Sequence, residues 1–500
     1  MPIQSPTIVP VPSDGTIDRA FKGTWCWHED KPHPIALPMN QALFSKGNDG
    51  SRDGPVFASL FVIALAVLFG GQGNGSAVRE MIVQLAAIAL LVATFKARKP
   101  PSNQLIRASY WLIISIFGLI ILHLLPLPFV LWEFLHPVPV AQQVLSELGL
   151  GYGWRPFTLV PNEAFDNLLL MIPPVAIFAA VVRMDGTQRA KIALGISAVA
   201  LLSAVLGLLQ YAGGTTTLHM YTATNRGFGV GFFSNRNHQA DLMIVGWLTT
   251  AAVLGSPHLR MGSMGRGMRL GILAALSGVF VLAVLATGSR GGLALALVAW
   301  LAIVTSQVGD FGKRGLAIIA GFVAFLFAAG SGALLSGNRI FAATLSRFGG
   351  DDEMRFLIWP RTIDFIGETL PFGIGIGSFV DYYKAKQPLA EVGPKFINSA
   401  HNEYLEIALE AGLPGIILML AGLGILAWAA VKVLRQGIGR DGTSQRIAVL
   451  AVFAILVLLI HSSFDYPLRT TTLVVIFAAL CGLIMPKPHD SGDRLKRPPY

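Results

Sequence analysis

Long apolar stretches separated by short polar segments fill the chain from residue 55 to residue 486. Most approach the roughly 20-residue length of a helix that crosses the hydrocarbon core of a bilayer. The pattern therefore predicts twelve membrane-spanning helices. We place them at 55–71, 79–95, 107–125, 166–182, 190–211, 239–255, 270–287, 291–307, 315–334, 414–431, 447–462 and 470–486.

The flanking segments carry no such pattern. Residues 1–54 hold scattered prolines and mixed charge without an apolar period, which predicts a disordered tail, and 487–500 form a second short tail. The first apolar run starts only near Pro55, so we expect no cleavable signal sequence.

The amino-acid composition indicates which class of protein these helices belong to. Hydrophobic residues make up 53% of the chain and charged residues only 13%, whereas soluble domains are about a quarter charged. We therefore expect an all-α polytopic membrane protein. The two cysteines, Cys26 in the tail and Cys481 in the last apolar run, support neither a disulfide nor a thiolate metal site.

Basic residues predict the orientation, because positively charged short loops stay in the cytoplasm. Counted over alternating connections, 25 of the 38 Lys and Arg residues fall on the side that holds both termini. Both tails are therefore predicted to be cytoplasmic, and one long loop, 335–413, faces outward. The net charge of +10 is then mainly an orientation signal, and no nucleic-acid partner is needed to explain it.

A short polar helix, predicted over 400–411 at the end of the long loop, is the first candidate site. Ser399 can cap it, Gly412 can close it, and Pro414 can open the next spanning helix. The prediction is a helix that meets the membrane directly, with its polar residues at the outer face.

His401 lies at the start of this predicted helix and is a candidate general base. At about 100° per residue, Glu403, Glu406 and Glu410 share the opposite face. The positive end of the helix dipole disfavours a second positive charge, which favours the neutral imidazole that a base requires. An interfacial histidine that bonds a backbone carbonyl is the alternative.

Several arginines fall on outward connections near His401 in this topology. A guanidinium at a membrane face needs an anion, which can be a lipid headgroup or a bound phosphate. Their convergence with His401 in one cavity would suit diphosphate binding and activation of a hydroxyl. The candidates are Arg226, Arg236, Arg290 and Arg355.

Three further motifs carry weaker predictions. The glycine-rich stretch PFGIGIGSF, 371–379, follows no strand, so a nucleotide-binding loop is ruled out and a loop-shaping turn is predicted. Asp351 to Glu353 read as a solvated acidic turn more readily than as a cation site. Asp465 and Arg469 are expected to pair and brace the last two spans.

Several motifs together resemble the O-antigen ligase and polysaccharide polymerase family of bacterial inner-membrane glycosyltransferases. The family signature of His and Asn followed by two glycines matches His401, Asn402, Gly412 and Gly415. Four further motifs match in the same order. They are the Arg-Gly-aromatic stretch at 226–237, TGSR at 287–290, the stretch 355–379 and the turn at 461–467.

The resemblance implies a function that fits the local chemistry. It implies that His401 activates an acceptor hydroxyl, supported by Asn402 and Glu403. It also implies that Arg226 or Arg236, together with Arg290, stabilises the departing diphosphate of an undecaprenyl-linked glycan, with Arg355 a further candidate. The acceptor would be a lipid A core sugar, the growing chain of another lipid-linked glycan, or a protein side chain, and the sequence does not distinguish these three. It also implies an inverting, metal-independent and cofactor-free reaction at the periplasmic face of a multi-pass protein in the inner membrane, which takes part in lipopolysaccharide or polysaccharide biosynthesis.

A secondary transporter, or a protein that binds or scrambles lipid-linked glycans, is the alternative from another class. Transporters place ionisable groups near the bilayer midplane, often in two repeated halves. Here Asp241, near one end of a predicted span, is the clearest charge inside the spans, and no half-repeat is evident. The polar residues gather at one face, which favours a transferase.

Overall fold

The computed structural model describes most of the apolar region. The described residues are 53–73, 76–97, 103–136, 147–149, 153–214, 218–255, 264–307, 355–389, 397–437 and 442–487, with 317, 320–321 and 324. Residues 1–52 and 488–500 of the predicted tails lie outside them. So do the acidic turn Asp351 to Glu353 and most of the predicted span 315–334.

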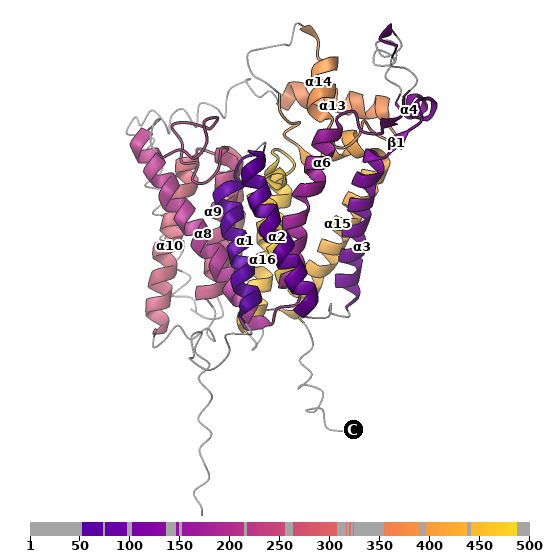
Figure 1. The fold of residues 1–500 in the computed structure, drawn as a ribbon. Helices are drawn as coiled ribbons and strands as arrows, with labels where there is room; N and C mark the ends of the chain where they lie inside the picture. Colours follow the sequence, from indigo (N-terminus) through magenta and orange to yellow (C-terminus); the bar gives the residue numbers. More distant parts are fainter. Residues whose placement is uncertain are drawn as a thin grey trace, which may run out of the picture. The chain divides into compact units, whose positions relative to one another are not determined.

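Most of the described chain is helical (Figure 1). In the first half the helices are α1 (Gly54–Phe69), α2 (Ala77–Ala97), α3 (Gln104–Leu124), α4 (Phe129–Leu135), α6 (Pro161–Leu170), α7 (Ile172–Val181), α8 (Gly186–Gly213) and α9 (Arg236–Leu254). The second half holds α10 (Arg266–Thr287), α13 (Arg355–Thr369), α14 (Phe379–Lys386), α15 (Glu403–Gln436), α16 (Gly442–His461), the 3₁₀ turn η4 (Pro467–Arg469) and α17 (Thr471–Ile484). A further helix, Arg290–Gln307, follows α10.

These helices agree with the apolar pattern. Each predicted span except 315–334 coincides with a described helix, the span 166–182 being divided between α6 and α7. Eight described helices are long and apolar enough to cross a membrane, while α1 and α17 are shorter apolar helices. The chain is a multi-pass membrane protein, although twelve spans are more than these criteria select.

Helix α9 lies at the centre of the bundle. Every residue from His238 to Leu254 is buried, and the helix packs against α8, α10 and α16. Trp247 donates its indole N–H to Ser277 of α10 at 2.8 Å. Such all-round burial means that protein, and not lipid, surrounds this helix.

A smaller layer covers one end of the bundle. Figure 1 shows α13 and α14 in orange at this end, beside the short helix α4. A separate apolar cluster joins α13 and α14 to the first turns of α15 through residues such as Phe365, Tyr383 and Leu409. The two-residue strands β1 (Pro126–Leu127) and β2 (Arg155–Pro156) pair antiparallel nearby.

Helix α15 breaks where the sequence predicts it. Gly412 has φ of +56° and ψ of −149°, and Pro414 follows within the next helical stretch. The glycine-rich turn docks at this break, since Ile374 N–H donates to Leu409 O at 3.0 Å and Gly375 N–H donates to Glu410 O at 2.9 Å. These donors satisfy carbonyls at the end of the first helical segment. The predicted loop-shaping role of PFGIGIGSF agrees with this contact.

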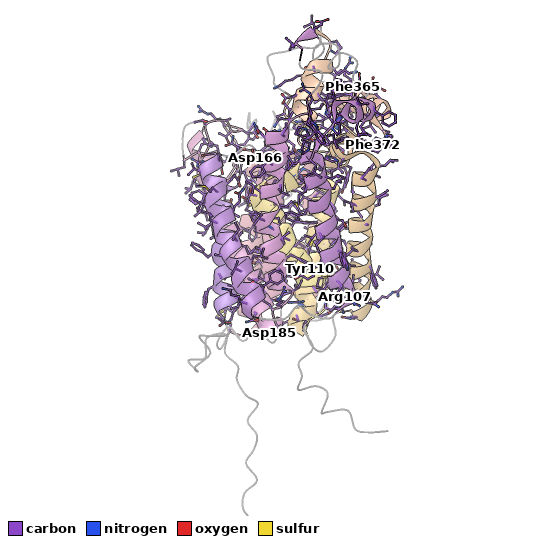
Figure 2. The ribbon with its side chains drawn as sticks, turned by 45° about the vertical axis from the view of Figure 1, so that its right-hand side comes forward. Arg107, Tyr110, Asp166, Asp185, Phe365 and Phe372 are labelled. Carbon is purple, nitrogen blue, oxygen red and sulfur yellow. The ribbon has the colours of Figure 1, made fainter. Side chains whose placement is uncertain are left out.

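Both ends of the described chain meet at the other end of the bundle. Asp53 forms an ion pair with Lys191 at the start of α8, and Arg189 donates to the carbonyl of Leu483 near the end of α17. Figure 2 labels Arg107 and Asp185 at this end, and Phe365 and Phe372 at the end covered by α13 and α14. The bundle thus has two chemically distinct ends.

Candidate active site

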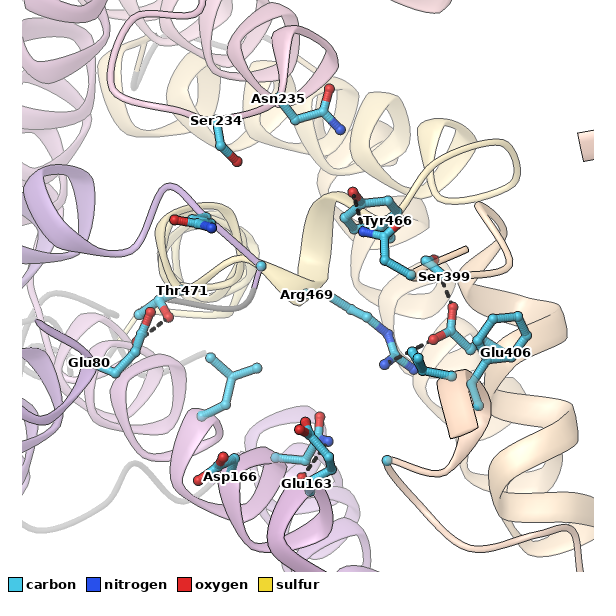
Figure 3. Close-up of a pocket in the computed structure, with 18 of the residues that line it drawn as sticks. Glu80, Glu163, Asp166, Ser234, Asn235, Ser399, Glu406, Tyr466, Arg469 and Thr471 are labelled. Carbon is cyan, nitrogen blue, oxygen red and sulfur yellow. Dashed lines mark hydrogen bonds and ion pairs between the residues drawn. The ribbon is translucent and has the colours of Figure 1, made fainter. Parts of the chain in front are cut away.

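A polar cavity of about 1090 Å³ lies at the end of the bundle covered by α14 (Figure 3). Its wall combines segments that are far apart in the sequence. These are one face of α2, α6, the loop before α9, the start of α14, the start of α15, and the turn before α17. Among the described lining residues are Glu80, Glu163, Asp166, Ser234, Asn235, Arg236, Asp381, Lys384, Asn398, Ser399, His401, Glu406, Glu410, Tyr466, Arg469 and Thr471.

His401 lines this cavity from a tight turn, and not from within a helix as predicted. Helix α15 begins at Glu403, and Asn402 is its N-cap, because the Asn402 side chain accepts from the backbone N–H groups of Tyr404 and Leu405. His401 has φ of +50°, which is uncommon for a residue with a side chain and marks a locally constrained turn. The predicted Ser399 cap is therefore wrong by three residues.

Asp465, from the turn between α16 and α17, lies beside the His401 ring. Its Oδ1 is 3.4 Å from His401 Nδ1 and 4.0 Å from His238 Nε2, and its Oδ2 accepts from the amide of Asn237. Burial alone would raise the pKa of Asp465, but the hydrogen bond from His401 and the neighbouring His238 and His401 imidazoles lower that pKa below its ordinary value. Asp465 is therefore a buried carboxylate that orients the imidazole.

Tyr466 closes the other side of this pair. Its ring centroid is 5.2 Å from that of His401, and its hydroxyl accepts from the side-chain amide of Asn398 at 3.2 Å. Burial, with the neighbouring Asp465 carboxylate, raises the pKa of Tyr466 to about 12. The phenol therefore stays neutral near neutral pH and packs the imidazole in place.

A second histidine and carboxylate pair lies behind the first. His461 Nδ1 is 2.5 Å from Asp241 Oδ1, and both side chains are buried. The turn that carries Arg290 packs here, because a side chain on Gly291 would approach His461 and Phe464. The buried pair of His461 and Asp241 therefore packs beneath the turn between α16 and α17, on the side away from the cavity.

The carboxylates of α15 face the protein interior. Glu403, Glu406 and Glu410 are all buried, and Glu403 accepts from Leu468 N–H at 2.7 Å. Arg469 forms ion pairs with Glu406 at 3.0 Å and Glu410 at 3.2 Å. Burial opposes the charge on Arg469, but Glu406 and Glu410 raise its pKa above the ordinary value. The predicted pairing of Asp465 with Arg469 is wrong, since each finds another partner.

Only one of the four predicted arginines is among the described residues that line the cavity. Arg236 is the first residue of α9, and its guanidinium lies 4.5 Å from the ring centroid of Phe228. Arg226 is exposed beside lining residues of the same loop, while Arg290 and Arg355 begin other helices. The sequence led us to expect all four arginines in one cavity, but of the four only Arg236 is among its described lining residues.

The sequence did not predict the roles of Asp465, Tyr466 and Arg469. The stretch HSSFDYPLRT was recognised as a turn, but its side chains were assigned to bracing the last two spans. One signal could have found them, because an acidic residue, an aromatic and an arginine follow each other in a short connection at the predicted outer face. Within the described residues, no group of three or more His, Cys, Asp or Glu is placed to hold a metal ion.

The comparisons with known proteins agree with the resemblance in the sequence. Residues 272–420 match the model of a family described as O-antigen ligase. This range includes Arg290, Arg355, His401 and Asn402, while Arg236 and Asp465 lie outside it. A search of curated proteins finds no match.

Proposed function

We propose that this chain is a membrane glycosyltransferase of polysaccharide synthesis, acting as a ligase or a polymerase, because residues 272–420 match the model of a family described as O-antigen ligase. The donor would be a glycan linked to undecaprenyl diphosphate. The acceptor would be a hydroxyl group of a lipid A core sugar or of another glycan. The family match carries the broad statement that this is a glycan-processing membrane enzyme.

The observation that carries the finer proposal is the contact between His401 and Asp465 at the wall of a large polar cavity. His401 Nδ1–H donating to the buried carboxylate leaves Nε2 as the proton acceptor. The His401 side chain keeps 29% of its surface exposed, so a substrate can reach it. A histidine in this setting is suited to general-base catalysis.

In the proposed reaction, His401 takes the proton from the acceptor hydroxyl as its oxygen attacks the anomeric carbon of the donor. The bond between that carbon and the diphosphate oxygen breaks, and polyprenyl diphosphate leaves. A single displacement of this kind inverts the anomeric configuration. Asn402 and Glu403 would support the base indirectly, because Asn402 caps α15 and Glu403 anchors it to the turn before α17.

The departing diphosphate needs positive charge, and Arg236 is the best placed predicted arginine. It lines the cavity at the N-terminal end of α9, where backbone N–H groups and the helix dipole also favour an anion. Arg226, Arg290 and Arg355 remain candidates for attracting the donor or binding it in a later state. Guanidinium groups can neutralise diphosphate charge directly, which supports the proposal of a metal-independent reaction.

We place the protein in the bacterial inner membrane with the cavity on the periplasmic side and both termini in the cytoplasm. The distribution of basic residues along the sequence supports this orientation. Asp53, the first described residue, pairs with Lys191 at the end of the bundle away from the cavity, as expected if the N-terminal tail and the cavity lie on opposite sides of the membrane. An activated donor outside the cytoplasm would have to arrive attached to lipid.

The direct test is transfer by the purified protein in lipid vesicles. Lipid-diphosphate-linked glycan would be supplied with lipid A core oligosaccharide, with a second lipid-linked glycan, or with no acceptor. We expect one acceptor to be extended, with release of lipid diphosphate and with His401→Ala inactive. Movement of donor across the membrane without any new glycosidic bond would favour the transporter or scramblase alternative.

A further inference from the structure

Arg469 holds two carboxylates of the same helix at once. Its Nη1 is 3.0 Å from Glu406 Oε1, and its Nη2 is 3.2 Å from Glu410 Oε2 (Figure 3). Arg469 comes from the turn before α17, while both glutamates come from the first turns of α15. The fork therefore fixes these two segments against each other at the cavity wall.

The second oxygen of Glu406 continues this connection to the His401 turn. Glu406 Oε2 accepts from Ser399 Oγ at 2.9 Å and from the backbone N–H of Ala400 at 3.2 Å. Ser399 Oγ in turn accepts from the backbone N–H of His401 at 3.0 Å. A chain of contacts thus runs from Arg469 through Glu406 and Ser399 to the backbone of His401.

The other arm of the fork leads away from His401. Glu410 Oε1 accepts from the backbone N–H of Phe379 at the start of α14, at 3.0 Å. Arg469 therefore aligns α14, α15 and the turn before α17 together. Only the Glu406 arm reaches the constrained turn whose φ is +50°.

Both glutamates are buried, so losing their ion pairs with Arg469 would leave uncompensated charge inside the protein. The side chains of Glu406 and Glu410 are 1% and 5% exposed, so each charge must be compensated inside the protein. Arg469 lines the cavity with 29% of its side chain exposed, but two carboxylates already offset its single positive charge, so it offers little net attraction to a substrate anion. Arg469 is thus better suited to holding structure at the site than to binding diphosphate.

We propose that Arg469 is a positioning residue that sets the orientation of His401 through Glu406 and Ser399. The proposal rests on the transferase function proposed above. It differs from the family resemblance, which supplied no role for Arg469. Its consequence is that a residue 68 positions away in sequence controls the turnover step without touching the reacting atoms.

The test is a double-mutant cycle of Arg469→Lys and Ser399→Ala. Lysine keeps the charge but loses the two-pronged contact, and alanine removes the link between Glu406 and the His401 backbone. Each single variant should lower kcat about ten- to a hundredfold, with the donor KM changed less than about twofold, because misplacement affects turnover more than binding. The kcat of the double variant should be at most about threefold below that of the less active single variant, because both substitutions interrupt the same series of contacts.

A matched control distinguishes positioning from general damage. Arg446 is also a buried arginine, but it donates to Gly255 O and Gln307 at the other end of the bundle. Arg446→Lys should leave kcat within about twofold. If Arg446→Lys lowered kcat as much as Arg469→Lys does, the proposal would be overturned. It would also be overturned if the losses of the two single variants multiplied in the double variant, or if the single variants raised only the donor KM.

A structural readout makes the proposal independent of the activity assay. A cryo-EM map of Arg469→Lys should show the His401 ring moved out of hydrogen-bonding distance of Asp465, and Ser399→Ala should show the same displacement. An unmoved ring in both variants would contradict the positioning role even if activity fell. Absence of transfer by the wild-type protein would instead count against the proposed function, and the maps would still decide the role of Arg469.

Discussion

The two ends of the helix bundle use buried charges differently. At the end away from the cavity, Arg189 donates to the carbonyls of Met485, Leu483 and Met184, and Arg446 donates to Gly255 O. These guanidinium groups meet neutral backbone oxygens where helices end. At the cavity end, buried carboxylates instead meet basic side chains, as in the contacts of Glu406 with Arg469 and of Asp465 with His401.

The difference distinguishes charged residues that stabilise the fold from charged residues that could act on a substrate. An arginine on helix carbonyls satisfies acceptors that would otherwise lie unpaired, and it needs no ligand to explain it. Opposed charges around an open cavity create a local field that can bind, orient and ionise a substrate. Variants at the cavity end should therefore change turnover, whereas variants at the other end should change stability.

The largest expected effect is that of His401→Ala. Loss of the general base should lower kcat by about a hundred- to ten-thousandfold in the vesicle transfer assay. His219→Ala is a suitable control, because His219 is not among the described residues that line the cavity. Equal activity of the two variants would show that turnover does not depend on His401.

Asp465→Asn should have the next largest effect. The amide can still contact His401 but cannot stabilise a positive imidazolium, so kcat should fall about a hundredfold at neutral pH. The measurement is steady-state transfer at saturating donor and acceptor. Full turnover by this variant would show that the carboxylate only packs the turn.

The sequence could predict those features of the site that are determined by residues close together in the chain. The break in α15 was predicted because Gly412 and Pro414 mark it within four residues. The N-cap was misplaced because Ser399 and Asn402 are both good caps. In the structure the Ser399 hydroxyl instead bonds Glu406 and the His401 N–H, and Asn402 caps the helix.

The pairings of charged residues could not be predicted from local pattern. Arg469 meets Glu406 and Glu410 across some sixty positions, and nothing in either segment selects that partner over Asp465. The TGSR motif forms a tight turn, since Gly288 has a positive φ of +58° and Thr287 Oγ1 accepts from Ser289 N–H.

Arg236→Ala should have a smaller effect, confined mainly to donor binding. Removing one charge-assisted contact to a diphosphate should raise the donor KM about ten- to thirtyfold. The exposed Arg226 offers a comparison within the same loop, and Arg226→Ala should raise that KM less than fivefold, as expected for a screened surface charge. A larger effect at Arg226 would move the diphosphate site out of the cavity.

The stability of the cavity end should depend on pH through Asp465. Its folded pKa is lowered, so the ionised carboxylate stabilises the protein above the ordinary pKa of about 4. That stabilisation is lost as pH falls below this value, by at most about 1.4 kcal/mol per pH unit. The gap in Tm between wild type and Asp465→Asn should therefore narrow from pH 6 to pH 3. Glu368→Gln, at an exposed ion pair with Lys386, should show no such change.

The smallest effect on turnover is expected at the other end of the bundle. Arg189→Lys loses several contacts to helix carbonyls, which should destabilise the protein by on the order of 2 kcal/mol. The kcat of the folded fraction should stay within about twofold of wild type. Thermal unfolding and transfer on the same sample would separate the two quantities.

The most direct test of the account is a cryo-EM structure of His401→Ala bound to a lipid-diphosphate-linked glycan. We predict that the diphosphate contacts Arg236 and that the anomeric carbon lies in the cavity facing position 401. A donor bound outside this cavity, with no contact to Arg236 and its glycan directed away from position 401, would contradict it.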